Sequence, residues 1–346
     1  MSGVARVLVC DDSAVIRGAV TRMLERDGQV RVVARAANGR EAVQEVARQK
    51  IDVAVLDIEM PELDGMAALP LLLKADPGLR VIMSSTLTTR GADIALRALR
   101  LGAADYIPKP TVAAIGDDSF RAELLAKVLG LARQRRGIAP VAPKLPPPRP
   151  APLLPPNLLA VGSSTGGPQA LFALVQALGP ALRVPVVVTQ HMPATFTRLL
   201  AEHLDRLGAM PCAEARHGEA LLPGRLYLAP GERHLLIERD GATLRATLAD
   251  TPAENFCRPA VDPMLRSAAA ACAGRVLVVM LTGMGQDGLL GTRAVVAAGG
   301  AALAQDEASS VVWGMPGAIA QAGLCRAVLP LGDLAGAARL LIGGRA

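Results

Sequence analysis

Residues 158–169 read LLAVGSSTGGPQ, an apolar run followed by a turn rich in serine and glycine and then by helix-forming residues. This order predicts a buried β-strand, a tight glycine turn and a helix. Similar apolar runs follow at residues 184–189, 276–281 and 301–304, with helical segments between them. Short strands that alternate with helices are typical of a doubly wound parallel sheet. Residues 235–247 add an antiparallel hairpin around an Asp-Gly turn. We therefore expect an α/β domain over residues 157–346.

The chain before residue 127 shows the same alternation of expected strands and helices. Short apolar runs alternate with helix-period segments at residues 7–9, 30–34, 53–56, 81–83 and 104–107. This pattern predicts a five-stranded doubly wound parallel domain over residues 1–126. Between the two domains, residues 139–156 hold nine prolines in 18 positions. Because proline favours extended chain, we expect a basic Pro-rich linker over residues 127–156, in which Arg133, Arg135 and Arg136 serve solubility.

Composition excludes several classes of protein. With 51% hydrophobic residues the 346-residue chain is not a disordered one, and with 2% aromatic residues it does not read single-stranded nucleic acid by base stacking. The net charge is +6, but residues 127–157 carry six basic and no acidic residues, so neither folded part is a basic nucleic-acid domain. The five cysteines form no C-x-x-C pair, and no apolar run reaches the ~18 residues of a membrane span. We expect a cytoplasmic monomer that binds no nucleic acid and does not insert into a membrane.

Acidic residues follow two of the expected strands in the first domain. Asp11 and Asp12 follow the first strand, and Asp57 follows the third. Because ligands bind beyond the carboxyl ends of parallel strands, we expect the three carboxylates to meet at one edge, where they would hold Mg²⁺. Ser85 and Lys109 follow two further strands and would reach the same edge to bind an acyl-phosphate oxygen. Alternatively each acid caps a helix, but that explanation does not account for all five positions together.

The turn at residues 162–166 fits the pattern G-x-S-x-G, which exposes Ser164 at the start of a helix. The same glycines could instead cradle a phosphate, so a phosphate-binding loop is the competing interpretation. A serine nucleophile needs a base, and all four histidines lie in this domain. His191 ends the run 184–189 and is the expected base. We expect His203 to be a solvated helix residue, and His217 and His234 to have structural roles.

A third group must orient the histidine, and Asp287 lies beyond the strand at residues 276–281. The chain order Ser, His, Asp differs from the Ser, Asp, His order of α/β-hydrolases, so that fold is not supported. Asp287 could instead cap the helix that begins near Gly288. A dinucleotide site is disfavoured, because neither glycine-rich loop gives G-x-G-x-x-G between a strand and a helix.

Residues 4–126 resemble a response-regulator receiver domain. The likeness rests on Asp11-Asp12, on Asp57 within LDIEMPELDG, on Ser85 within SSTLT and on Asp105–Lys109 within DYIPKP. The resemblance implies that Asp57 accepts a phosphoryl group from a histidine kinase and that Asp11, Asp12 and Asp57 hold Mg²⁺. It also implies that Ser85 and Tyr106 form the switch pair and that Lys109 contacts the phosphate.

The segments GSSTGGP, QHMP, CRPAVD and LTGMGQDG, followed by SSVVWGMPGAIAQAG, resemble the catalytic domain of the chemotaxis receptor methylesterases (CheB) over about residues 157–335. The sequence departs from that family at Cys257 and Ala260, where an aromatic residue and serine are frequent, and at Gly317, where a basic residue is frequent. These departures leave the triad intact.

The CheB resemblance implies a phosphorylation-activated hydrolase of glutamyl methyl esters on methylated chemoreceptors, which also deamidates receptor glutamines. In that mechanism Ser164 is the nucleophile, His191 the base and Asp287 its orienting partner. The backbone N–H groups of Thr165 and Met284 are candidates for the oxyanion hole, and hydrolysis needs no cofactor. The alternative is an output module that binds a nucleotide or phosphate and has no hydrolase activity.

Overall fold

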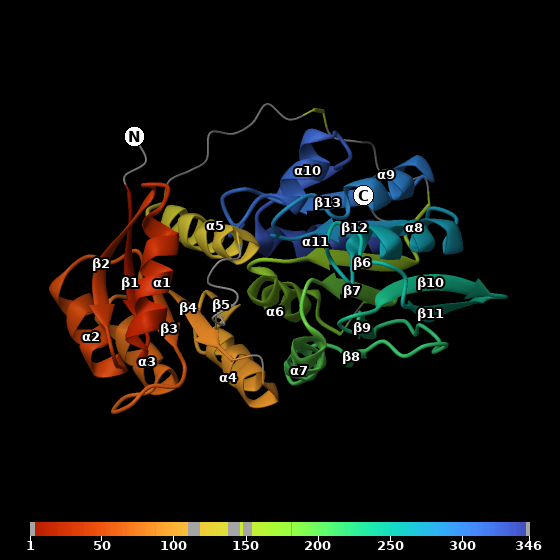
Figure 1. Ribbon diagram of the computed structural model, residues 1–346. Coiled ribbons are helices and arrows are strands. Elements are labelled where there is room, and N and C mark those ends of the chain that lie inside the picture. Colours follow the sequence, from red (N-terminus) through yellow and green to blue (C-terminus); the bar gives the residue numbers. More distant parts are fainter. Residues whose placement is uncertain are drawn as a thin grey trace. The chain divides into compact units, whose positions relative to one another are not determined.

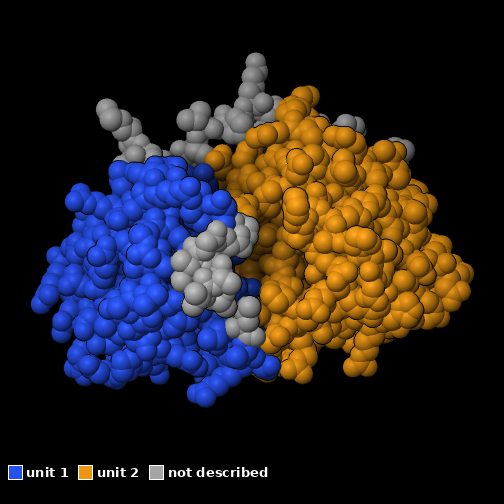
Figure 2. Space-filling model, viewed as in Figure 1, with its two compact units in different colours: residues 1–139 blue, residues 140–346 orange. Residues whose placement is uncertain are grey.

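The structure is a computed structural model, and it describes residues 4–86, 88–109, 118–137, 146–147, 154–180 and 182–343. The chain forms two compact units, residues 1–139 and 140–346, which Figure 2 shows in different colours. Most of the Pro-rich segment that was expected to be a linker lies outside the described residues.

The first unit is a five-stranded parallel sheet with the strand order β2-β1-β3-β4-β5, and this confirms the predicted fold (Figure 1). Helix α1 packs on α5, whereas α2 packs on α3 and α3 on α4. The described elements are β1 (Ala5–Cys10), α1 (Ala14–Glu25), β2 (Val30–Ala36), α2 (Gly39–Arg48), β3 (Val53–Asp57), α3 (Gly65–Ala75), β4 (Arg80–Ser85), α4 (Thr89–Arg100), β5 (Asp105–Pro108) and α5 (Asp118–Arg135).

The second unit contains a seven-stranded sheet with the order β14-β13-β12-β6-β7-β9-β8, in which all the strand pairs are parallel. Its described elements are β6 (Leu158–Ser163), α6 (Gly167–Leu178), β7 (Val186–Gln190), α7 (Ala194–Asp205), β8 (Cys212–Glu214), β9 (Leu226–Leu228), β10 (His234–Asp240), β11 (Thr243–Ala249), α8 (Val261–Ala271), β12 (Val276–Met280), α9 (Leu289–Ala297), β13 (Ala301–Gln305), α10 (Met315–Gln321), β14 (Ala327–Leu329) and α11 (Leu331–Gly343).

Strands β10 and β11 form the expected antiparallel hairpin, with Asp240 opposite Thr243 across a two-residue turn. The hairpin packs on α8, which also contacts β6 and α9. The three central strands β12, β6 and β7 are buried along their whole length, and this explains why they read as continuous apolar runs. Within the described ranges, no helix combines the length and apolar character that a bilayer crossing requires.

Helix α5 runs to Arg135 and so passes residue 126, where the sequence predicted the domain to end. Its apolar face continues through the buried residues Val128 and Leu131. Arg135 at the end of α5 and Arg136 directly after it have acidic partners, contrary to the expectation that they serve solubility. Arg135 lies 2.6 Å from Asp76, and Arg136 pairs with the buried Asp52. These ion pairs therefore hold the end of α5 against the rest of the first unit.

Lys127 lies in the part of α5 that was assigned to the linker, yet its side chain is almost fully buried. Its Nζ atom is 3.0 Å from Asp105 Oδ2 and 3.2 Å from Glu123 Oε1, and it donates a hydrogen bond of 2.7 Å to the carbonyl oxygen of Tyr106. Burial and the loss of water disfavour both charges, so each depends on the other. The pair joins α5 to β5.

We expect Lys127→Met to destabilise the first unit by about 3–5 kcal/mol, because it leaves the Asp105 carboxylate buried without its partner. Urea unfolding of the full chain, followed by circular dichroism, measures this change. Lys74→Met is the matched control, since Lys74 is exposed on α3. Equal stability of the two variants would show that the buried pair contributes nothing.

Candidate functional site

The carboxyl edge of the first sheet gathers the acidic residues that the sequence singled out. One carboxylate oxygen from each of Asp11, Asp12 and Asp57 lies within 4.8 Å of the other two. Asp11 and Asp57 are buried and Asp12 is exposed. Three carboxylates at this spacing repel one another, and oxygen donors of this kind are those that Mg²⁺ prefers. The donor set therefore fits a divalent cation.

Lys109 follows β5 and reaches the same cluster. Its Nζ atom is 2.6 Å from Asp57 Oδ2 and 3.2 Å from Asp11 Oδ2. Burial raises the pKa of Asp57, the hydrogen bond from Lys109 lowers it, and the charges of Asp11 and Asp12 raise it further, to about 6 in all. The pKa of Lys109 is raised although burial opposes its charge, because Asp57 and Asp11 favour the ammonium form.

The two residues expected to act as a switch pair are both buried. Ser85 ends β4, and its hydroxyl donates to the carbonyl oxygen of Thr86 at 3.1 Å. Tyr106 lies on the neighbouring strand β5, and the Lys127 ammonium is 5.3 Å from the centre of its ring. Gly91 at the start of α4 lies so close to Ser85 that a Cβ there would approach the Ser85 hydroxyl to 2.9 Å.

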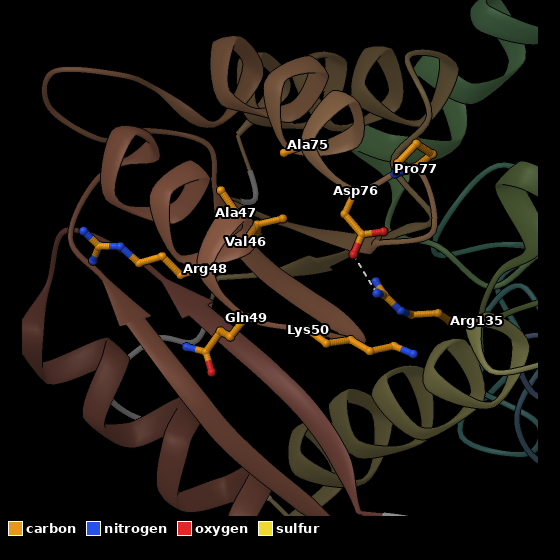
Figure 3. Close-up of a pocket in the computed structure, with 9 residues that line it drawn as sticks. All are labelled: Val46, Ala47, Arg48, Gln49, Lys50, Ala75, Asp76, Pro77 and Arg135. Atoms are coloured by element: carbon orange, nitrogen blue, oxygen red, sulfur yellow. Dashed lines mark hydrogen bonds and ion pairs between the residues drawn. The ribbon is translucent and has the colours of Figure 1, made fainter.

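A separate cavity of about 450 Å³ lies in the first unit, away from this edge (Figure 3). Its lining comes from the ends of α2, α3 and α5, and the Asp76–Arg135 ion pair spans it. None of the predicted site residues lines this cavity, so it is a gap between helix ends rather than part of the site.

In the second unit the predicted nucleophile, base and acid follow three adjacent strands. Ser164 follows β6, His191 follows β7, and Asp287 lies beyond β12, while the sheet order places β6 between β12 and β7. Parallel strands end at the same edge, which brings the three residues together. The expectation that the Ser164 and His191 strands are neighbours is confirmed, with Ser163 paired to Gln190.

Glycines allow the Ser164 turn to pass close to its neighbours. Gly166 has a φ of +75°, and a Cβ there would approach Val311 to 2.5 Å. A Cβ on Gly283 would approach that of Ser164 to 2.9 Å. The Ser164 backbone N–H donates to the carbonyl oxygen of Thr282 at 3.0 Å, which ties the two loops together.

The Asp287 carboxylate is 2% exposed and accepts hydrogen bonds from several elements. The backbone N–H groups of Val261 and Asp262 donate to it at 2.6 and 3.1 Å, and that of Gly288 at 2.9 Å. The Asn255 amide donates at 3.0 Å. Burial alone would raise the pKa of Asp287, but the hydrogen bond and charge of His191 and the backbone N–H groups of Val261 and Asp262 lower it. Asp287 thus also caps a helix, although the helix is α8 rather than the one after Gly288.

His191 lies between Asp287 and Cys257. Its Nε2 atom is 2.8 Å from Asp287 Oδ2, and its Nδ1 atom is 3.4 Å from the Cys257 sulfur. Burial lowers the pKa of the imidazole, but the bonds to Asp287 and Cys257 raise it to about 9. Because a carboxylate only accepts hydrogen bonds, Nε2 carries the proton in the neutral ring, and Nδ1 is the basic nitrogen.

Ser164 is half-buried, and its hydroxyl makes no hydrogen bond to His191 in the described part of the chain. Such contacts often tighten only when substrate binds. The backbone N–H groups of Thr165 and Met284 likewise donate to no acceptor among the residues that the structure describes. They are therefore available to an oxygen atom placed beside Ser164.

The remaining histidines divide as follows. His234 is buried, donates to the carbonyl oxygen of Pro252 and accepts from the N–H of Ala260, so the structural role expected for it is confirmed. His217 accepts from the N–H of Leu248. The prediction for His203 was wrong: it is 0% exposed, because its face of α7 turns towards the core.

Asn255 and Asp262 support the site, and neither was expected from the sequence. Asn255 bridges the Asp262 and Asp287 carboxylates, and Asp262 accepts from the N–H of Gly291 at 2.6 Å. The only signal in the sequence was the position of Asp262 in the segment CRPAVD.

Comparison with known families identifies both units. Residues 159–338 match the family model described as CheB methylesterase, and residues 7–115 match that of the response regulator receiver domain. The chain is 52% identical, over 95% of its length and 94% of the relative's, to a protein-glutamate methylesterase/protein-glutamine glutaminase of Paramagnetospirillum magneticum. It is 53% identical to the Azospirillum brasilense protein of that description, over 95% of this chain and 90% of the relative.

Among solved structures, the chain is similar to the CheB methylesterase catalytic domain of Thermotoga maritima. The identity is 36% and the TM-score 0.52, and the match covers 55% of this chain and 99% of that one. The match supports the fold described for the second unit.

We expect nuclear magnetic resonance titration to show His191 with a pKa of about 9. In Asp287→Asn the pKa should fall, because the carboxylate that favours imidazolium is gone while burial remains. Folding favours the protonated ring, so this contribution to stability is complete below the ordinary pKa of 6.5 and is lost as the pH rises through about 9. An unchanged pKa in Asp287→Asn would contradict the coupling, and the His191→Gln spectrum assigns the signal.

Proposed function

This chain belongs to the CheB methylesterase family and carries a response regulator receiver domain, and from that premise we propose the function of its two units. It is a protein-glutamate methylesterase that hydrolyses glutamyl methyl esters on chemoreceptors. The same acyl chemistry on a glutamine side chain releases ammonia, which gives the protein-glutamine glutaminase activity. Phosphorylation of the receiver by a histidine kinase activates the hydrolase.

The His191–Asp287 pair beside the Ser164 turn supports this function most directly. We propose that Ser164 Oγ attacks the ester carbonyl while His191 Nδ1 accepts the hydroxyl proton. Asp287 stabilises the imidazolium that forms, and the N–H groups of Thr165 and Met284 bind the tetrahedral oxyanion. The ester bond then breaks, and methanol leaves with the proton from His191. Water attacks the acyl-enzyme with His191 as base and restores Ser164 and a glutamate carboxylate.

In the receiver we propose that Asp57 is the phospho-acceptor and that Asp11, Asp12 and Asp57 hold Mg²⁺. The cation would offset the charge of the transferred phosphoryl group. Lys109 already bonds to an Asp57 oxygen and would pair with the phosphoryl group once it is attached. The proposed switch residues are Ser85, the last residue of β4, and Tyr106 on β5.

The alternative of a phosphate-binding output module without hydrolase activity is not supported. The sequence match covers 94% and 90% of two relatives, and both relatives are named protein-glutamate methylesterase/protein-glutamine glutaminase.

We expect Ser164→Ala to lower methanol release from methylated receptor membranes by at least about 10³-fold, because no other group takes over the covalent step. In the wild type, release should rise with pH towards about 9 as His191 loses its proton. Gas-phase collection of labelled methanol measures the rate, and circular dichroism verifies that the variant is folded. Substantial release by folded Ser164→Ala would contradict the proposed nucleophile.

We expect acetyl phosphate and Mg²⁺ to label wild-type protein and raise methanol release, and we expect neither effect in Asp57→Asn. Chelation of the metal with EDTA should abolish labelling, because the carboxylate cluster then lacks its cation. Glu59→Gln is the matched control, since Glu59 is an exposed acid two positions beyond Asp57. Labelling that persists in Asp57→Asn would place the acceptor elsewhere.

A further inference from the structure

Residues 254–257 form a tight turn beside the catalytic groups. Glu254 and Cys257 exchange two backbone hydrogen bonds of 2.9 and 3.1 Å, and Asn255 and Phe256 lie between them. Both central residues have positive φ, +51° and +62°. A two-residue turn of this kind favours Asn-Gly, because glycine tolerates the left-handed region. This chain has phenylalanine at the second position.

No packing of the Phe256 side chain within the described chain offsets the strain of this backbone. Its exposed fraction is 104%, so it buries no surface against its own chain. A bulky residue in the left-handed region destabilises the turn, and strain of this kind concentrates at binding and active sites. A glycine would satisfy the local structure better. The presence of phenylalanine therefore points to a contact outside the chain.

The residues on both sides hold Phe256 in place next to the catalytic pair. The Cys257 sulfur is 3.4 Å from His191 Nδ1, and the Asn255 amide donates to Asp287. Glu254 is 2.6 Å from Arg266 on α8, which fixes the start of the turn. Because the backbone of the turn is already anchored, covering the ring costs only the rotational freedom of its own side chain. The turn that carries this ring contacts both His191 and Asp287, so a protein segment that presents an ester to Ser164 is large enough to cover the ring.

We propose that Phe256 is a specificity-determining residue that anchors the protein substrate: it packs against aliphatic side chains of the receptor segment that carries the glutamyl ester. This inference rests on the proposed function and names the contact that distinguishes a receptor from a small ester. Met284, 39% exposed in the loop that faces Ser164, offers a second apolar surface at the site. Aromatic anchors of this type commonly carry much of the affinity of a protein contact.

Two substrates separate anchoring from catalysis. In Phe256→Gly we expect kcat/KM for methylated receptor membranes to fall about 10- to 100-fold, the range set by burying one aromatic side chain. Hydrolysis of p-nitrophenyl acetate, which is too small to reach the ring, should change less than about twofold. Glycine suits the turn, so urea unfolding should show that Phe256→Gly is at least as stable as wild type. Leu340→Ala, which shortens an exposed side chain on α11, is the control and should leave both rates unchanged.

Two other outcomes would overturn the proposal, and a third would overturn the proposed function on which it rests. Unchanged receptor hydrolysis in Phe256→Gly would show that the ring does not bind the substrate. An equal fall for both esters would assign Phe256 to the geometry of the catalytic groups. If wild-type protein itself shows no methanol release that depends on Ser164, the proposed function fails instead, and the two failures are thereby distinguished.

Discussion

The charge of Asp287 is buried, so protein groups must replace the water that a carboxylate normally binds. Donors come from the start of α8, from Gly288, from the Asn255 turn and from His191. An uncompensated buried charge costs several kcal/mol, so these segments hold their positions together. Much of the site depends on this requirement. The path of the loop after β12, the entry to α8 and the orientation of the imidazole all follow from the same set of hydrogen bonds.

The acidic edge of the first unit is arranged differently. There Asp11, Asp12 and Asp57 face one another, and Lys109 supplies a single positive charge. Burial and the neighbouring carboxylates raise the pKa of Asp57 to about 6, although the hydrogen bond and charge of Lys109 lower it. Unlike Asp287, this cluster is suited to binding a cation and a phosphoryl group from solution. Two sheets of the same type thus place carboxylates at their strand ends, but several donors hold the charge of Asp287, whereas the three carboxylates of the first unit share the ammonium of Lys109.

Strand order explains what the sequence could predict. Ser164, His191 and Asp287 each follow an apolar run, and parallel strands bring such positions to one edge without any knowledge of side-chain contacts. The supporting residues could not be found in this way. Asn255 lies in a turn with positive φ values that no sequence pattern predicts, and Asp262 is held by a hydrogen bond from the N–H of Gly291. Lys127 was assigned to a linker because proline and basic residues follow it, whereas its burial depends on the long-range partner Asp105.

The Cys257 contact has a consequence for the base. With Asp287 at Nε2, the neutral imidazole has its lone pair on Nδ1, and a thiol lies 3.4 Å from that atom. Sulfur makes only weak hydrogen bonds, so the contact holds the ring in place while the pKa of His191 stays raised. A serine hydroxyl that approaches with bound substrate displaces a weak bond rather than a strong one. Because Cys257 and Phe256 are adjacent in one turn, a substrate that packs on the ring also touches the segment that faces the base.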